Sequence, residues 1–163
     1  MTTMISQELN DAINAQIGRE FGASLQYMQI ASFFDGLALS QAAKLFFEQA
    51  QEEHDHAMKF LKYILDAGGE VHIPPIDAPK SSFVSAEEVV SLALKWEEDV
   101  TGYINNLMEI ALRQKDYIAR QFLDWFENEQ LEEVSKMDKL LRVVKGVGER
   151  NLYMIEAYLS HLD

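Results

Sequence analysis

Four glutamates in this sequence occupy positions where helical periodicity would place apolar side chains. They are Glu20, Glu53, Glu97 and Glu133, and His56 follows the second of them by three residues. At about 100° per residue, each acid falls in or beside the apolar stripe of its own segment. Removing an unpaired carboxylate from water costs several kcal/mol, so four of them would be prohibitive against a total stability of roughly 5–15 kcal/mol. Bound cations would remove that cost.

The residue types indicate which cations these would be. Carboxylates and one imidazole, without a thiolate, suit two hard or borderline divalent ions, and the histidine favours Fe(II) or Mn(II) over Mg(II). No lysine or arginine is expected on the central stripes, since Arg19 lies beside Glu20 but points off its stripe. A lone buried glutamate is more often a hydrogen-bonded residue than a ligand. Four inward acids at a shared level, one of them paired with His56, favour a two-metal site.

Helical phase separates these acids from their neighbours. Glu53 lies about 35° from the middle of its apolar face, whereas Glu52 lies about 135° away. On the last long segment Glu129 lies close to Glu133, and Gln130 flanks the same stripe. Glu52 is therefore predicted to face away from the interior, and Gln130 to lie near the site.

Four long segments with helical periodicity must position these side chains, and strand-like alternation is nearly absent. Ser6 suits an N-cap, Ser85 with Glu88 forms a capping box, and Gly146 and Gly148 are expected to break the last long helix. The predicted helices cover residues 6–34, 40–68, 85–113 and 116–145, with a short tail helix at 149–161. The connection between the second and third helices contains all three prolines and is long enough to run back along a bundle. The predicted fold class is all-α: a four-helix bundle over about residues 6–145, in one domain spanning 1–163.

The bulk composition excludes several classes of function. Against 14 basic residues the chain has 27 acidic ones, a formal charge of -13, so nucleic acid is not expected as a partner. It has no cysteine, which excludes disulfides, iron–sulfur clusters and thiolate zinc sites. Residues 1–15 lack the pattern of a signal peptide, and no apolar run approaches the roughly 18 residues of a membrane span. The expected location is cytoplasmic, without membrane attachment.

Four stretches resemble the ferritin superfamily, and the resemblance extends over essentially the whole chain. They are Ile17-Gly-Arg-Glu20 leading to Tyr27, Gln51 to His56, Lys95-Trp-Glu97, and Phe122 to Glu133. The resemblance implies a first iron held by Glu20, Glu53 and His56. It also implies a second iron that shares Glu53 and is held by Glu97 and Glu133.

Gln130 marks a difference from dedicated di-iron oxidases, which carry a second Glu-x-x-His on the fourth helix. Here the corresponding unit is Gln130-x-x-Glu133, which would place Gln130 beside the second iron but supply neither an imidazole nor a second charge. The second iron is therefore expected to bind more weakly, which suits iron in transit to storage. Prokaryotic ferritins are also similar in a third, looser site, whose counterparts here are Glu52, Glu129 and Glu132. A solvated helix face remains the alternative for Glu52 and Glu132.

Two aromatic residues also resemble the family, and one histidine marks a difference from its haem-carrying members. Tyr27 and Trp125 are predicted on the inner stripes and resemble the aromatic pair beside such centres, where either could donate an electron. Simple core packing is the alternative for both. His54 stands where haem-carrying bacterioferritins have a methionine after the bridging glutamate, so haem is not expected.

The function that this resemblance implies is iron storage with ferroxidase activity. Fe(II) would be oxidised by O2 or H2O2 at an intra-subunit di-iron site, and the ferric product stored in a hollow homo-oligomer of roughly 24 subunits. A di-iron or di-manganese oxidase, or a peroxide-detoxifying enzyme without storage, is the alternative from the same fold. A non-catalytic helical adaptor is a third possibility, but it would be expected to carry apolar residues in place of Glu20, Glu97 and Glu133.

Overall fold

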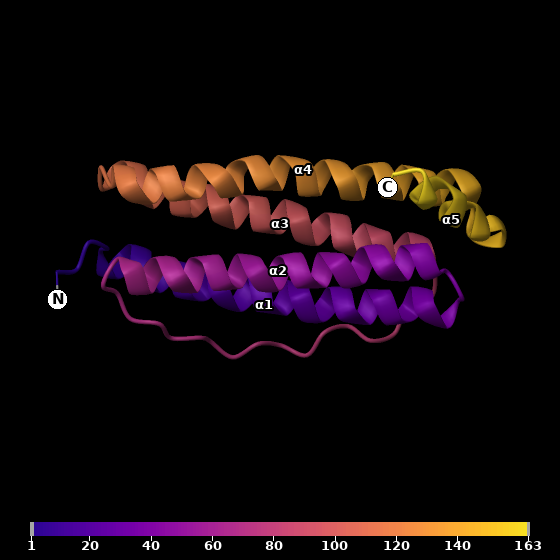
Figure 1. The fold of residues 1–163 in the computed structure, drawn as a ribbon, viewed down its shortest axis with the longest axis horizontal. Helices are drawn as coiled ribbons and strands as arrows, with labels where there is room; N and C mark the ends of the chain where they lie inside the picture. Colours follow the sequence, from indigo (N-terminus) through magenta and orange to yellow (C-terminus); the bar gives the residue numbers. More distant parts are fainter. Residues whose placement is uncertain (1, 163) are drawn as a thin grey trace.

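A computed structural model describes residues 2–162 as a bundle of four long helices with a short helix at one end (Figure 1). The long helices are α1 (Gln7–Gly36), α2 (Ser40–Asp66), α3 (Ala86–Arg113) and α4 (Tyr117–Val147). A 3₁₀ turn, η1 (Glu149–Asn151), leads to α5 (Tyr153–Ser160). Residues 2–162 contain no strand, and the predicted all-α fold with one long crossover and a short fifth helix is confirmed. None of these helices is long and apolar enough to cross a membrane.

Side-chain caps fix where α1 and α3 begin. Ser6 Oγ accepts a hydrogen bond from the Leu9 amide at 3.1 Å, and Ser85 Oγ accepts one from the Glu88 amide at 3.0 Å, as their sequence positions predicted. The fourth helix was expected to end at about Lys145, before two breaking glycines. It continues through Gly146 to Val147, and Gly148 breaks it, with a φ of +73° that glycine adopts more readily than other residues.

The crossover between α2 and α3 runs in extended form along the bundle, beside α1 (Figure 1). Buried amides on α1 hold it in place by bonding to its backbone. Asn10 and Asn14 both donate to the Glu70 carbonyl, at 3.0 and 2.8 Å, and Gln26 donates to the Lys80 carbonyl at 2.9 Å. These side chains satisfy backbone groups that an extended, unpaired segment would otherwise leave to water.

The apolar core consists of two clusters separated by a polar layer. On α1, the buried residues of one cluster precede Gly18 and those of the other follow Phe21. The polar layer therefore crosses α1 at Glu20. The same gap occurs between residues 50 and 57 on α2, between 93 and 100 on α3, and between 126 and 137 on α4. Every acid that the sequence placed on an apolar stripe therefore lies at one level of the bundle.

The buried face of α4 differs from the predicted stripe. Helical periodicity predicts Ile118, Trp125 and Phe126 on one apolar stripe. Phe126 is buried, but Ile118 and Trp125 are 57% and 40% exposed, and the buried face runs through Ala119, Leu123 and Phe126. The prediction followed the bulkier side chains, whereas the helix turns the small Ala119 inward. Periodicity likewise predicts Tyr103 on the buried face of α3, where it is 37% exposed.

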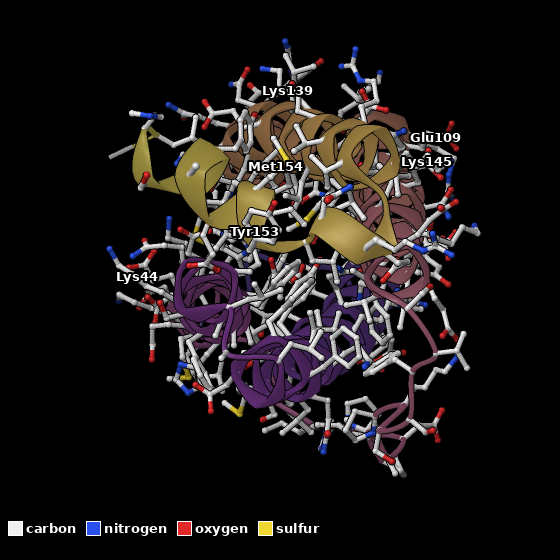
Figure 2. The ribbon with its side chains drawn as sticks, turned by 90° about the vertical axis from the view of Figure 1, so that its right-hand side faces the viewer. Lys44, Glu109, Lys139, Lys145, Tyr153 and Met154 are labelled. Carbon is white, nitrogen blue, oxygen red and sulfur yellow. The ribbon has the colours of Figure 1, made fainter. Side chains whose placement is uncertain are left out.

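The tail is attached through two carboxylates that cap other helices. Glu156 on α5 accepts hydrogen bonds from the Gln41 and Ala42 amides at 2.7 and 3.3 Å, supplying the cap that α2 lacks locally. Glu149 accepts from the first amides of α3. Both interactions place negative charge at a helix N-terminus. The tail helix consequently lies at one end of the bundle beside α2 and α4, with Tyr153 on its outer side (Figure 2).

Candidate metal centre

The polar layer brings together acids from all four long helices. Glu20, Glu53, His56, Glu97 and Glu133 are each at most 4% exposed. They form two sets that share Glu53, one with Glu20 and His56 and the other with Glu97 and Glu133. In each set one ligand atom from every residue lies within 4.8 Å of the others. Two cation positions with a common carboxylate are the arrangement that these distances allow.

The first set contains an unsatisfied oxygen. Gln16 Nε2 donates to Glu20 Oε1 at 2.7 Å, but Glu20 Oε2 is the single buried side-chain oxygen or nitrogen without a hydrogen-bond partner in the part of the chain that the structure describes. His56 Nδ1 lies 4.0 Å from that oxygen and 3.4 Å from Glu53 Oε2. A buried carboxylate oxygen without a donor is costly, and a cation between these three groups would satisfy it.

The second set is held by hydrogen bonds from neutral side chains. The Tyr27 hydroxyl donates to Glu97 Oε1, and Gln130 Nε2 donates to Glu97 Oε2 at 3.2 Å. Gln49 Nε2 donates to both Glu133 Oε2 and Glu53 Oε1, at 2.6 and 3.1 Å. These hydrogen bonds hold the carboxylates close together, although like charges repel. The geometry of the second set therefore exists before a cation binds.

Lys136 reaches the polar layer, contrary to the expectation that no basic side chain would. Its Nζ donates to Glu133 Oε1 at 3.0 Å, to Gln49 Oε1 at 2.9 Å and to Glu52 Oε2 at 3.4 Å. Its backbone position is off the centre of the stripe, but the long flexible stem carries the ammonium back over one turn. The spacing Glu133-x-x-Lys136 is the sequence feature that could have revealed it.

Gln16 and Gln49 are two more residues that the sequence analysis missed. Each is at most 1% exposed, and each precedes an inward glutamate, Glu20 or Glu53, by four residues and donates to it. Residues four apart share a helix face. The repeated Gln-x-x-x-Glu spacing could therefore have found both.

Burial shifts the proton affinities of the acids. It raises the pKa of Glu97 to about 8, and the charge of Glu53 adds to the shift. Burial and Glu53 also hold the pKa of Glu20 well above its usual range. For Glu133 burial again raises the pKa, although the Lys136 ammonium opposes the shift. With a pKa of about 8, Glu97 carries a proton near neutral pH in the cation-free protein, and a divalent ion would displace it.

Glu53 and His56 behave as an ion pair in the same state. Burial favours the neutral form of Glu53, but the neighbouring His56 outweighs it and lowers the pKa of that carboxyl. Burial likewise disfavours the imidazolium, but Glu53 outweighs it and raises the pKa of His56. A metal ion at the first position would take the place of the imidazole proton.

The residues predicted for a third site are less closely grouped. Glu129 Oε1 lies 3.8 Å from His56 Nε2, Glu52 contacts Lys136, and Glu132 is exposed. Among residues 2–162 no set of three close ligand atoms includes any of these acids. The third site stays a prediction.

Trp125 covers the outer side of His56 rather than lying on an inner stripe. Its ring meets the imidazole edge-on, with the ring centroids 5.5 Å apart. Lys59 Nζ lies 3.1 Å from the centre of the indole ring on the exposed side. Tyr27, by contrast, is 1% exposed and lies in the interior as predicted.

Comparison with known proteins identifies the family of this chain. Residues 10–147 match the family described as "Ferritin-like domain", a segment that contains the whole polar layer. The chain belongs to the ferritin family. Among curated relatives, this ferritin is 43% identical over 148 residues to Ferritin BfrB of Mycolicibacterium smegmatis, covering 91% of this chain and 81% of that protein. It is 36% identical over 159 residues to the bacterial non-heme ferritin of Staphylococcus haemolyticus, covering 96% of each.

Solved structures agree with this assignment. The open pore ferritin of the hyperthermophilic archaeon Archaeoglobus fulgidus superposes on this ferritin with a TM-score of 0.91, at 31% sequence identity, over 96% of this chain and 97% of that one. The resemblance inferred from the sequence is thus confirmed at the level of family and fold.

Proposed function

We propose that this ferritin stores iron and is a ferroxidase that binds two Fe(II) ions as substrate within each subunit. The observation that carries the proposal is the unsatisfied Glu20 Oε2, buried beside His56 and Glu53 where a cation would complete its coordination. In the proposal Glu20, Glu53 and His56 hold the first ion. Glu53 is shared with the second ion, which Glu97 and Glu133 complete.

The neutral donors of the layer position these ligands. Gln130 and Tyr27 both donate to Glu97, and Gln49 links Glu133 to Glu53. Burial keeps the pKa of Tyr27 well above its usual value, so its hydroxyl stays protonated and remains a donor. Such outer contacts fix the orientation of ligands, and their loss typically weakens metal binding about 10–100-fold.

Oxidation follows from the charge of the ligand set. Carboxylates stabilise Fe(III) more than Fe(II), because the interaction grows with the charge of the ion. Two Fe(II) ions give up one electron each, which reduces O2 with two protons to H2O2, or H2O2 with two protons to two waters. The proton displaced from Glu97 when iron binds is released at the same place.

Storage requires a cavity that a single subunit does not form. The proposal therefore includes a homo-oligomeric shell, with roughly 24 subunits as the family resemblance implies, located in the cytoplasm. Support comes from the ferritin relatives, which match nearly the full chain. The formal charge of -13 also suits a surface that attracts iron cations.

The test is aerobic oxidation of Fe(II) by the purified protein, with oxygen uptake recorded and particle size measured by analytical ultracentrifugation. Glu53→Gln should lower the initial rate at least about tenfold without changing particle size, because it removes the shared ligand's charge but keeps its shape. Glu48→Gln, an exposed position on the same helix, is the matched control and should oxidise iron at the wild-type rate. Wild-type rates in Glu53→Gln would refute the proposed site, and a wild-type protein without iron oxidation would refute the function.

A further inference from the structure

Lys136 is a positive charge that the chain itself places against the polar layer. Its ammonium has three oxygen partners from two helices: Glu133 on α4, and Gln49 and Glu52 on α2. A lysine ammonium in contact with these oxygens is a cation at physiological pH.

The position of the ammonium is one that a metal ion would otherwise suit. Glu133 Oε1 and Glu52 Oε2 both face it, at 3.0 and 3.4 Å, so these two carboxylates converge on one point outside the two metal positions. An ion bound there would need the same two oxygens. The ammonium and a further metal ion therefore exclude one another.

Lys136 also separates the acids from open space. It lines a cavity of about 360 Å³ between α2, α4 and α5, together with Glu132 and Lys139. Apolar side chains of α5, Tyr158 and Leu159, form part of the far wall. The cavity has room for a hydrated cation, and Glu132 adds a carboxylate to the residues that line it with Lys136.

We infer that Lys136 acts as a tethered cation that takes the place of a further metal ion between Glu52 and Glu133. Each subunit then holds two ions, which argues against the third site that the sequence predicts around Glu52. This inference rests on the proposed two-ion site. It makes Lys136 a positioning residue rather than a ligand. Its charge also repels an ion held by Glu133, so it weakens the second position while keeping Glu133 and Gln49 oriented when no metal is present.

The test is anaerobic titration of the metal-free assembled protein with Fe(II), followed by calorimetry to count ions and measure affinities. Lys136→Gln, which keeps a hydrogen-bond donor and removes the charge, should bind a third ion and hold the second about tenfold more tightly. Lys136→Arg retains the charge and should bind two ions like the wild type. Lys139→Gln removes the same charge from an exposed position three residues further along α4 and is the matched control, with two ions expected.

A double variant identifies where the third ion binds. Adding Glu52→Gln to Lys136→Gln should abolish the third ion and leave the first two in place. Two ions with unchanged affinities in Lys136→Gln would overturn the inference, as would three ions in the wild-type protein, and neither result would touch the proposed ferroxidase. A wild-type protein that binds no Fe(II) would instead overturn the proposed function itself.

Discussion

Glu97→Gln should stabilise the metal-free protein although it removes a proposed ligand. Glu97 is fully buried, and burial with the nearby Glu53 raises its pKa to about 8 from an ordinary 4.5. A group whose pKa is raised in the folded state stabilises the fold most at low pH, and that contribution is lost as pH rises from about 4.5 through about 8. An amide in its place mimics the protonated acid at every pH, and Gln130 can turn its own amide to pair with it.

The size of the effect follows from the same shift. At pH 7 the unfolded chain has lost the Glu97 proton and the folded one retains it, which costs the folded state about 1.4 kcal/mol per pH unit above 4.5, or about 3 kcal/mol in total. Exposure does not reduce this figure, since the side chain is out of contact with solvent. For a domain of this length about 3 kcal/mol corresponds to a rise in melting temperature of roughly 6–12 °C.

The assay is thermal unfolding of chelator-treated protein at pH 5, 7 and 8. Glu97→Gln should melt well above the wild type at pH 7 and 8, and the difference should shrink at pH 5. Glu98→Gln is the matched control, because it changes the adjacent exposed acid and should leave the melting temperature unchanged. A Glu97→Gln protein that melts at or below the wild type at pH 7 would refute the reasoning that keeping a proton on the buried Glu97 costs the folded protein stability.

Three further predictions concern other parts of the molecule. Metal affinity should rise with pH and level off above about 8, where Glu97 no longer holds a proton to displace, and Zn(II) calorimetry between pH 6 and 9 would show this. Gly18→Ala should lower the free energy of unfolding by about 1–3 kcal/mol, because the added Cβ would lie 2.4 Å from Pro74 Cγ. Gly102→Ala adds a Cβ in open space and should leave stability unchanged, which thermal unfolding of the two variants would show. Glu156→Gln should cost about 0.5–2 kcal/mol through the weakened α2 cap, with Fe(II) affinity unchanged in the same preparation.

The sequence predicted the level of the acids well because helical phase depends only on residue spacing. Glu20, Glu53, Glu97 and Glu133 were placed inside from their positions, and all four lie in the buried polar layer. The phase of a helix is harder to assign where bulky side chains occur on two faces. For this reason the predicted buried face of α4 includes Ile118 and Trp125, which are exposed, and omits the small Ala119, which is buried.

The contacts of long polar side chains could not be predicted in the same way. Lys136 lies off the centre of its stripe, yet its ammonium reaches Glu133 because several rotatable bonds separate charge from backbone. Gln16 and Gln49 are ordinary helix residues by type, and only the partner four residues along indicates their role. Helical phase determines the direction in which a side chain leaves the backbone. The surrounding charges determine where the polar group at its end lies.

The division of the core explains how the bundle tolerates its own acids. Each long helix contributes to an apolar cluster on both sides of the polar layer, so the unfavourable layer is held between two regions of apolar packing. Within the layer some donors come from the same helix as the acid, as Gln16 does for Glu20, and others from a neighbouring helix, as Tyr27 does for Glu97. The ligands are therefore oriented before metal arrives, and binding exchanges protons and hydrogen bonds for a cation without rebuilding the backbone. A site of that kind can be filled and emptied repeatedly, which is what a protein that passes iron onward requires.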